Sequence, residues 1–167
     1  MKVHLILSII TLALVVACTP KQSVIISDST GETTLGVLQH GFNLNEGTAE
    51  SFEEGLLLMH NFEYDDALTA FEAATAADST EVMTHWGEAM CHYKALWRLQ
   101  NTNKGMAIIE RLGATREERL ASIDDPIEHA FWTGLEIIYG EGDFDERNKM
   151  YSEHMASLHE DLSLIHI

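Results

Sequence analysis

The sequence has few of the residues that break helices or cross-link small folds. Its 167 residues include only 2 prolines, 2 cysteines and 11 glycines. So few breakers favour helices, and two cysteines exclude a disulfide-dense scaffold. Apolar residues make up 46% of the chain and charged residues 22%, which is typical of a globular protein and not of a disordered one. A chain of this length is expected to form one domain with a sizeable core.

Basic residues are also scarce. Ten Lys and Arg face 27 Asp and Glu, which gives a formal net charge of −17. Such a surface repels phosphates, so we expect no nucleic-acid partner and no docking on anionic headgroups through a basic patch. The sequence has no Gly-rich phosphate loop, no nucleophile elbow and no Cys-x2-Cys pair. We therefore expect a protein that is not an enzyme and that needs no cofactor or metal.

The N-terminus is typical of an export signal. Lys2 supplies a positive charge, and the run from Val3 to Ala17 is almost entirely apolar. At about fifteen residues this run is too short to span a bilayer comfortably, but it fits a signal peptide. Its end, Val15-Val16-Ala17-Cys18, resembles the lipobox of bacterial lipoproteins. The resemblance implies that residues 1–17 are removed and that Cys18 is acylated.

Several acyl chains on one cysteine give stable membrane anchoring, and we expect the membrane contact to be made by this lipid anchor only. In this family an Asp after the cysteine is a retention signal, so Thr19 suggests the outer membrane, while the periplasmic face of the inner membrane stays open. An ordinary signal peptide with a chance cysteine and an uncleaved anchor stay open as alternatives. Residues 18–46 are rich in Ser, Thr, Gly and Gln, which predicts a flexible tether.

Helical spacing of apolar residues begins after the tether. It predicts helices over residues 48–60, 64–77 and 80–98. Asp78 and Glu81 are spaced like a capping box for the third helix. The inward stripe of that helix is predicted to consist of Met83, Trp86, Met90, Tyr93 and Trp97.

The first two helices carry the small-residue pattern of a tetratricopeptide repeat. In that family a Gly of one helix faces an Ala-x3-Phe element of the next, so the backbones approach closely. The chain therefore resembles this family, which implies an all-α fold of stacked antiparallel hairpins, a divergent α-solenoid. The predicted packing residues of these repeats are Gly55, Leu58, Ala67, Phe71, Ala74, Trp86 and Tyr93.

A longer pattern is similar to large, poorly characterised tetratricopeptide proteins of the bacterial cell envelope. Their signature is Gly-Leu-x-Leu-x-His-Asn-Phe-x-Tyr-x-x-Ala followed by Trp-Gly-Glu-Ala-Met, found here at 55–67 and 86–90. The resemblance covers residues 47–161. It implies protein binding and no known reaction.

The C-terminal part is predicted to be helical as well. Thr115 with Glu118 reads as a capping box, Asp125 caps a helix that begins with Pro126, and Asp143 caps the last helix. The final residues, 162–167, resemble a translated sequencing adapter. We therefore expect a non-native tail on an N-terminal fragment, while a genuine end stays open as the alternative.

Four polar residues are predicted to line a partner-binding groove: Asn61, His85, Glu88 and His92. The last three share one side of the third predicted helix, away from its apolar stripe. Stacked hairpins present a concave surface, and an acidic groove would select basic or amine-bearing protein segments. Glu88→Ala is then expected to weaken binding without unfolding the domain.

The same His-Glu-His set could instead bind zinc or copper. However, His85 and His92 are two turns apart, about 10.5 Å along a helix axis, and the i,i+4 histidine spacing of zinc proteases is absent. A metal-handling envelope protein and the non-catalytic part of a larger enzyme stay open as alternative functions. Cys91 lies within a helical pattern and is expected to be a buried, inert thiol.

Overall fold

The computed structural model describes residues 40–163, with side chains up to residue 160. The predicted signal peptide, Cys18, most of the predicted tether and residues 164–167 lie outside the described residues. The described part is almost entirely helical, which confirms the all-α prediction. Its seven helices are α1 Glu46–His60, α2 Tyr64–Ala77, α3 Val82–Cys91, α4 Thr102–Ile109, α5 Arg116–Ala121, α6 Pro126–Ile138 and α7 Phe144–Ser163.

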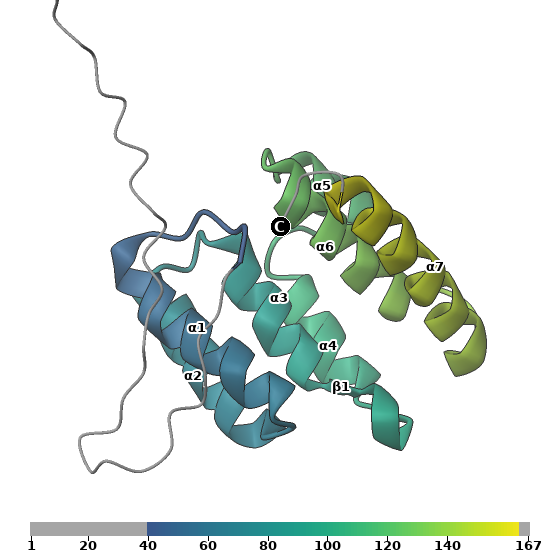
Figure 1. Cartoon of the computed structure of the whole chain (residues 1–167), viewed down its shortest axis with the longest axis horizontal. Helices are drawn as coiled ribbons and strands as arrows, with labels where there is room; N and C mark the ends of the chain where they lie inside the picture. The colour runs from purple at the N-terminus through teal and green to yellow at the C-terminus, as the bar shows by residue number, and fades with distance from the viewer. Residues whose placement is uncertain (1–39, 164–167) are drawn as a thin grey trace, which may run out of the picture.

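The helices lie side by side in pairs (Figure 1). The α1 and α2 helices pack on each other at one side, α3 and α4 lie in the middle, and α6 and α7 pack together at the other side. Helix α3 is central, because it contacts α1, α2, α4 and α6. The short helix α5 packs on α6. Within residues 40–160, no helix is long and apolar enough to cross a membrane.

Most of the predicted helix starts are confirmed by side-chain caps. The Thr115 hydroxyl accepts from the Glu118 N–H at 3.2 Å, while the Glu118 carboxylate accepts from the Thr115 N–H at 3.0 Å. Asp125 accepts from two backbone N–H groups of α6. The expected box at Asp78 is wrong, because Asp78 accepts from the N–H and hydroxyl of Thr80 instead.

The closest helix contacts surround the ring of Phe71. A methyl group added to Gly55 of α1 would lie 2.8 Å from this ring, and one added to Gly87 of α3 would lie even closer to it. Phe71, Ala67 and Ala74 are fully buried. Gly55 and Gly87 therefore both lie against Phe71, and Ala67 and Ala74 are buried in the same core; of these, Gly87 is the one that is not among the predicted packing residues.

The other predicted packing residues also contact the core. Trp86 and Tyr93 are each only 6% exposed, and Leu58 packs against the core while partly buried. Tyr93, however, does so from a strand and not from the predicted helix.

The predicted helix over residues 80–98 is half as long as expected. It ends at Cys91 and is followed by an antiparallel strand pair, β1 Tyr93–Lys94 and β2 Leu99–Gln100, joined by a 3₁₀ turn over Ala95–Trp97. Tertiary contacts hold this hairpin: the Tyr93 hydroxyl donates to Asn148 of α7, and its ring packs on Phe144 and Tyr151. Helical periodicity in the sequence could not reveal a partner fifty residues away.

The predicted tether is too long at its C-terminal end. Phe42 is 6% exposed and belongs to the core, and Leu44 packs against it. Residues 40–45 are therefore part of the folded domain, and helix α1 already begins at Glu46. Apolar burial outweighs the tether-like composition of the surrounding sequence.

Candidate functional site

An open cavity of about 490 Å³ lies between the first helix of each pair and is mainly apolar. Helices α1, α3, α6 and α7 all contribute to its wall, and so does the segment before α1. We call this the apolar cavity; its helical lining includes Leu56, Met59, Trp86, Met90, Phe131 and Tyr151. Cavities of this size, lined by apolar and aromatic side chains, are typical binding sites.

The segment His40–Asn43 lies along this cavity. The Phe42 ring meets Phe52 of α1 and Phe131 of α6 edge to face, with centroid distances of 5.8 and 5.1 Å. It also stacks on His40 at 5.4 Å. An extended piece of chain is thus bound by the faces of two helices.

Two carboxylates hold the polar groups of this segment. The His40 Nε2 lies 3.0 Å from the Glu53 carboxylate of α1. The Asn43 N–H donates to the Glu128 carboxylate of α6 over 3.4 Å. Burial raises the pKa of Glu128, and the nearby charges of Asp125 and Glu81 act in the same direction. The apolar cavity therefore has acidic groups beside it, although not the ones that were predicted.

The prediction that His85 and Glu88 are reachable from solvent is wrong. They are 4% and 1% exposed. His85 Nε2 lies 3.0 Å from the Ser79 carbonyl oxygen. Glu88 accepts from the Thr75 hydroxyl at 2.5 Å and from Arg111 at 2.8 Å. Helix α3 is surrounded by four helices, so it has no outward face on which these side chains could line a groove.

The other two predicted groove residues also lie away from the apolar cavity. Asn61 is exposed, but it ends α1, and its amide donates to the Leu57 carbonyl at 2.8 Å. His92 is half-buried and lines a second cavity on another part of the surface. The four predicted residues therefore do not form one site.

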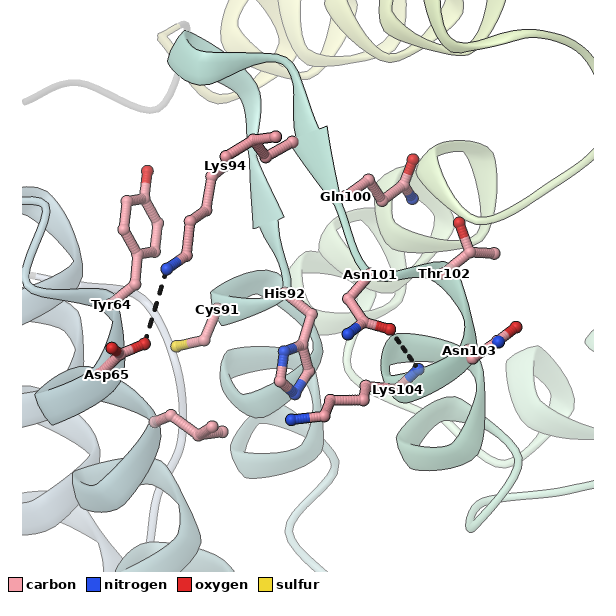
Figure 2. Close-up of a pocket in the computed structure, with 12 residues that line it drawn as sticks. Tyr64, Asp65, Cys91, His92, Lys94, Gln100, Asn101, Thr102, Asn103 and Lys104 are labelled. Atoms are coloured by element: carbon pink, nitrogen blue, oxygen red, sulfur yellow. Dashed lines mark hydrogen bonds and ion pairs between the residues drawn. The ribbon is translucent and has the colours of Figure 1, made fainter.

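Most of the residues that line the second cavity, of about 570 Å³, are polar, and we call it the polar pocket (Figure 2). It lies where the start of α2, the end of α3, the strand pair and the start of α4 meet. Lys94 lies 3.5 Å from Asp65, and Lys104 extends beside the His92 ring. The Asn101 side chain accepts from the Lys104 N–H at 3.2 Å. Two lysines give this pocket a locally basic character within an acidic protein.

Titratable groups of the polar pocket are shifted by burial and by these lysines. Burial lowers the pKa of His92, and Lys104 and Lys94 lower it further. Burial raises the pKa of the Cys91 thiol to about 12. Cys91 is 2% exposed and stays protonated at neutral pH, which agrees with the predicted inert thiol.

Metal binding by the His-Glu-His set finds no support in this geometry. Hydrogen bonds within the protein already engage His85 and Glu88, and His92 lies beyond the end of the helix. Among residues 40–160, no three His, Cys, Asp or Glu side chains are grouped so that they could hold a metal ion.

The residues that form the apolar cavity were not predicted as a site, because their signal in the sequence is that of core residues. Trp86 and Met90 belong to the apolar stripe of α3, and Phe42 lies in the polar segment before the first helix. Only the isolated aromatic within that segment could have indicated a contact. In comparisons of this chain, no protein-family model, no curated protein and no solved structure matches it.

Proposed function

We propose that this protein is a lipid-anchored binding scaffold of the bacterial cell envelope. Its helix pairs form a divergent tetratricopeptide-like array, and its apolar cavity binds an extended segment of a partner protein. The small-residue packing around Phe71 supports the array. The lipobox-like sequence before Cys18 supports the anchor.

One observation carries the binding proposal: the chain's own segment His40–Asn43, which has no regular secondary structure, already packs beside this cavity. Its aromatic side chain packs between rings of α1 and α6. Its polar groups meet Glu53 and Glu128. A partner segment of the same chemistry combines an aromatic or large apolar side chain with flanking hydrogen-bond donors or cations.

The remaining apolar cavity beside Phe42 explains why a partner would bind better than the internal segment. That segment leaves about 490 Å³ open next to Met59, Trp86 and Met90. A longer partner segment can place a second apolar side chain there and bury additional surface. The internal segment then acts as a competitor, which lowers the apparent affinity until the partner displaces it.

A synthetic peptide with the sequence of residues 38–46 tests this site directly. A Phe42→Ala chain frees the aromatic position, and fluorescence anisotropy measures binding of the labelled peptide to it. We expect saturable binding, at least tenfold weaker for a peptide with Ala in place of Phe. The unsubstituted chain should bind the peptide more weakly, because its own Phe42 competes.

Two further variants locate the binding. Met90→Glu places a charge in the apolar cavity and should abolish peptide binding, whereas Ala73→Glu on the exposed face of α2 should not. Equal binding of the Phe and Ala peptides would contradict the proposal. The anchor is tested separately: labelled palmitate should be incorporated into the full chain and not into the Cys18→Ser variant.

A further inference from the structure

Exposed apolar side chains gather at one end of the molecule. Among residues 40–160 the large apolar side chains that stay exposed are Phe62, Leu96, Trp97, Leu99 and Met150. All except Met150 belong to the strand pair or to the turn between α1 and α2. We call Phe62, Leu96, Trp97 and Leu99 the apolar tip; their exposed fractions are 55%, 70%, 49% and 60%. The strand pair projects beyond the helices (Figure 1).

Two separate turns build this tip. The Phe62 ring lies 5.5 Å from the Trp97 ring, edge to face, and Tyr64 meets the same indole at 5.9 Å. Phe62 has a φ of +66° and Arg98 one of +54°. A bulky aromatic residue rarely adopts this left-handed conformation, which Gly or Asn adopts at lower cost. Phe62 is thus strained and more than half exposed, and its ring contacts that of Trp97, which is itself half exposed.

The base of the tip is firmly held. Tyr93 is buried and donates to Asn148. The Gln100 amide donates to the Ile138 carbonyl at 3.1 Å and accepts from Arg147 at 2.8 Å. The tip is therefore presented by a fixed support and does not have to become ordered when it binds, which lowers the cost of binding.

Two cations beside the tip are paired with acids, although the whole chain carries −17. Lys94 lies 3.5 Å from Asp65 and 5.1 Å from the Tyr64 ring. Arg98 lies 2.8 Å from Asp145 and stacks over Phe144 at 5.0 Å. These pairs offset the charges of Asp65 and Asp145, which reduces the repulsion between this end and a bilayer.

We infer that the apolar tip inserts into the interfacial layer of the phospholipid bilayer that carries the chain's lipid anchor. Trp with neighbouring Leu and Phe is the composition favoured at that layer. A projecting tip suits insertion, whereas a partner protein is more often met by a flat or concave surface. The inference rests on the lipid anchoring in the proposed function: only 21 residues separate Cys18 from His40, so the tip stays at high local concentration near the membrane.

Insertion of the tip would add a second membrane contact to the lipid anchor. Two contacts fix the orientation of the domain, so the apolar cavity would hold a constant direction relative to the bilayer. A lipid anchor at the end of a flexible tether would, by itself, leave that direction free.

Tryptophan fluorescence provides the test. The chain has three tryptophans, and of these Trp86 and Trp132 are 6% and 0% exposed, so Trp97 is the one that can meet lipid. The full lipidated chain is reconstituted in vesicles of phosphatidylethanolamine and phosphatidylglycerol that contain brominated phosphatidylcholine. We expect bromine to quench part of the emission and the Trp97→Phe variant to lose this quenching.

Leu96→Asp should abolish the quenching while the protein still floats with the vesicles. Met150→Asp is the matched control, because Met150 is 44% exposed on α7, and it should be quenched like the unsubstituted chain. The inference would be overturned if the protein floats with the vesicles but bromine does not quench it. It would also be overturned if the Leu96→Asp variant is quenched as much as the unsubstituted chain. Shielding of Trp97 from acrylamide without quenching by bromine would also overturn the inference, because the tip would then be covered by protein and not by lipid.

Failure of the anchor gives a different result. If the chain is not lipidated, it does not float, and the proposed anchoring fails. The tip is then tested alone by titrating the Cys18→Ser chain with the same vesicles. Adding Leu96→Asp to the Cys18→Ser chain should weaken its partitioning into the vesicles at least tenfold. Equal partitioning of the two chains would overturn the inference.

Discussion

Two regions of this protein join their helices by opposite means. Around Phe71, helices α1, α2 and α3 approach closely because Gly55 and Gly87 have no side chains. Helices α5 and α6 are instead joined by a buried ion pair, in which Arg119 donates to Glu136 at 2.6 and 2.8 Å. The first contact is therefore sensitive to an added methyl group, and the second to the loss of either partner.

The ion pair between α5 and α6 belongs to a fully satisfied network. Arg119 and Glu136 are 4% and 7% exposed. Arg119 also donates to the Gly113 carbonyl at 2.9 Å, and the Trp132 indole donates to Glu136 at 3.3 Å. A buried charge is tolerated only when its partners are present, whereas a pair of apolar residues can often replace both.

The largest effect is expected from breaking this pair on one side. Arg119→Met leaves the Glu136 carboxylate buried without its cation and should lower the free energy of unfolding by about 3–5 kcal/mol. The double variant with Glu136→Leu should recover most of that loss. Urea unfolding followed by circular dichroism measures both variants.

Arg116 provides the matched control for this change. It is exposed on the same short helix, so Arg116→Met should change the free energy of unfolding by less than about 0.5 kcal/mol. A double variant as unstable as Arg119→Met alone would contradict this account of the pair.

The second effect tests the apolar contact in the opposite direction, by adding atoms. Gly87→Ala places a methyl group against the Phe71 ring and should cost about 1–3 kcal/mol. The ring has little room to move away, because Gly55 also lies against it. Phe71→Leu should then be less damaging in the Gly87→Ala chain than alone, which a double-mutant cycle measures.

Gly47 is the control for the glycine prediction. A methyl group there meets only the Asn45 side chain, at 3.3 Å, so Gly47→Ala should be neutral or slightly stabilising. Equal losses at Gly47 and Gly87 would contradict the account in which contact with Phe71 sets the cost.

The third effect concerns a polar group within the apolar region. Glu88→Ala removes the acceptor of Arg111 and leaves the Thr75 hydroxyl only the Phe71 carbonyl, so it should cost about 1–3 kcal/mol. Thermal unfolding should therefore show a lower melting temperature. Glu72→Ala, an exposed acid on α2, is the control and should have almost no effect. An unchanged melting temperature for Glu88→Ala would restore the sequence-based expectation of a surface role.

The smallest effect is one of pH, at the acid next to the apolar cavity. Since the pKa of Glu128 is raised in the folded state, ionisation of this group lowers stability as the pH rises through its folded pKa. Glu128→Gln should thus stabilise the protein at pH 7, by less than about 1 kcal/mol. The gain should vanish near pH 4, where both folded and unfolded carboxyls are mostly protonated. A gain that is independent of pH would contradict the role of ionisation.

The glycine-packed region could be predicted from sequence because its cause is local and repeated. Gly55, Ala67 and Phe71 stand at fixed spacings, and those spacings express how closely two helices approach. Helix caps such as Thr115 with Glu118 could be predicted for the same reason, since the two partners are three residues apart. Gly87 lies outside that spaced pattern, in a third helix, and its place beside Phe71 depends on how α3 packs on the first pair.

The candidate site could not be predicted in this way. His85 and Glu88 read as an exposed polar face, since the third predicted helix was assumed to have one apolar side and one free side. The structure surrounds α3 with four helices, and the polar residues become internal hydrogen-bond partners. Whether a polar face meets solvent or another helix depends on contacts far apart in the chain.

By itself, the sequence determined the helical class, the caps and the close packing around Phe71, because each depends on residues a few positions apart. Tertiary structure decided the end of α3 at Cys91, the strand pair with its exposed tip, the burial of Glu88, and the docking of Phe42 between α1 and α6. These features depend on partners that folding brings together from distant positions. The apolar cavity belongs to this second group, since its lining comes from four helices.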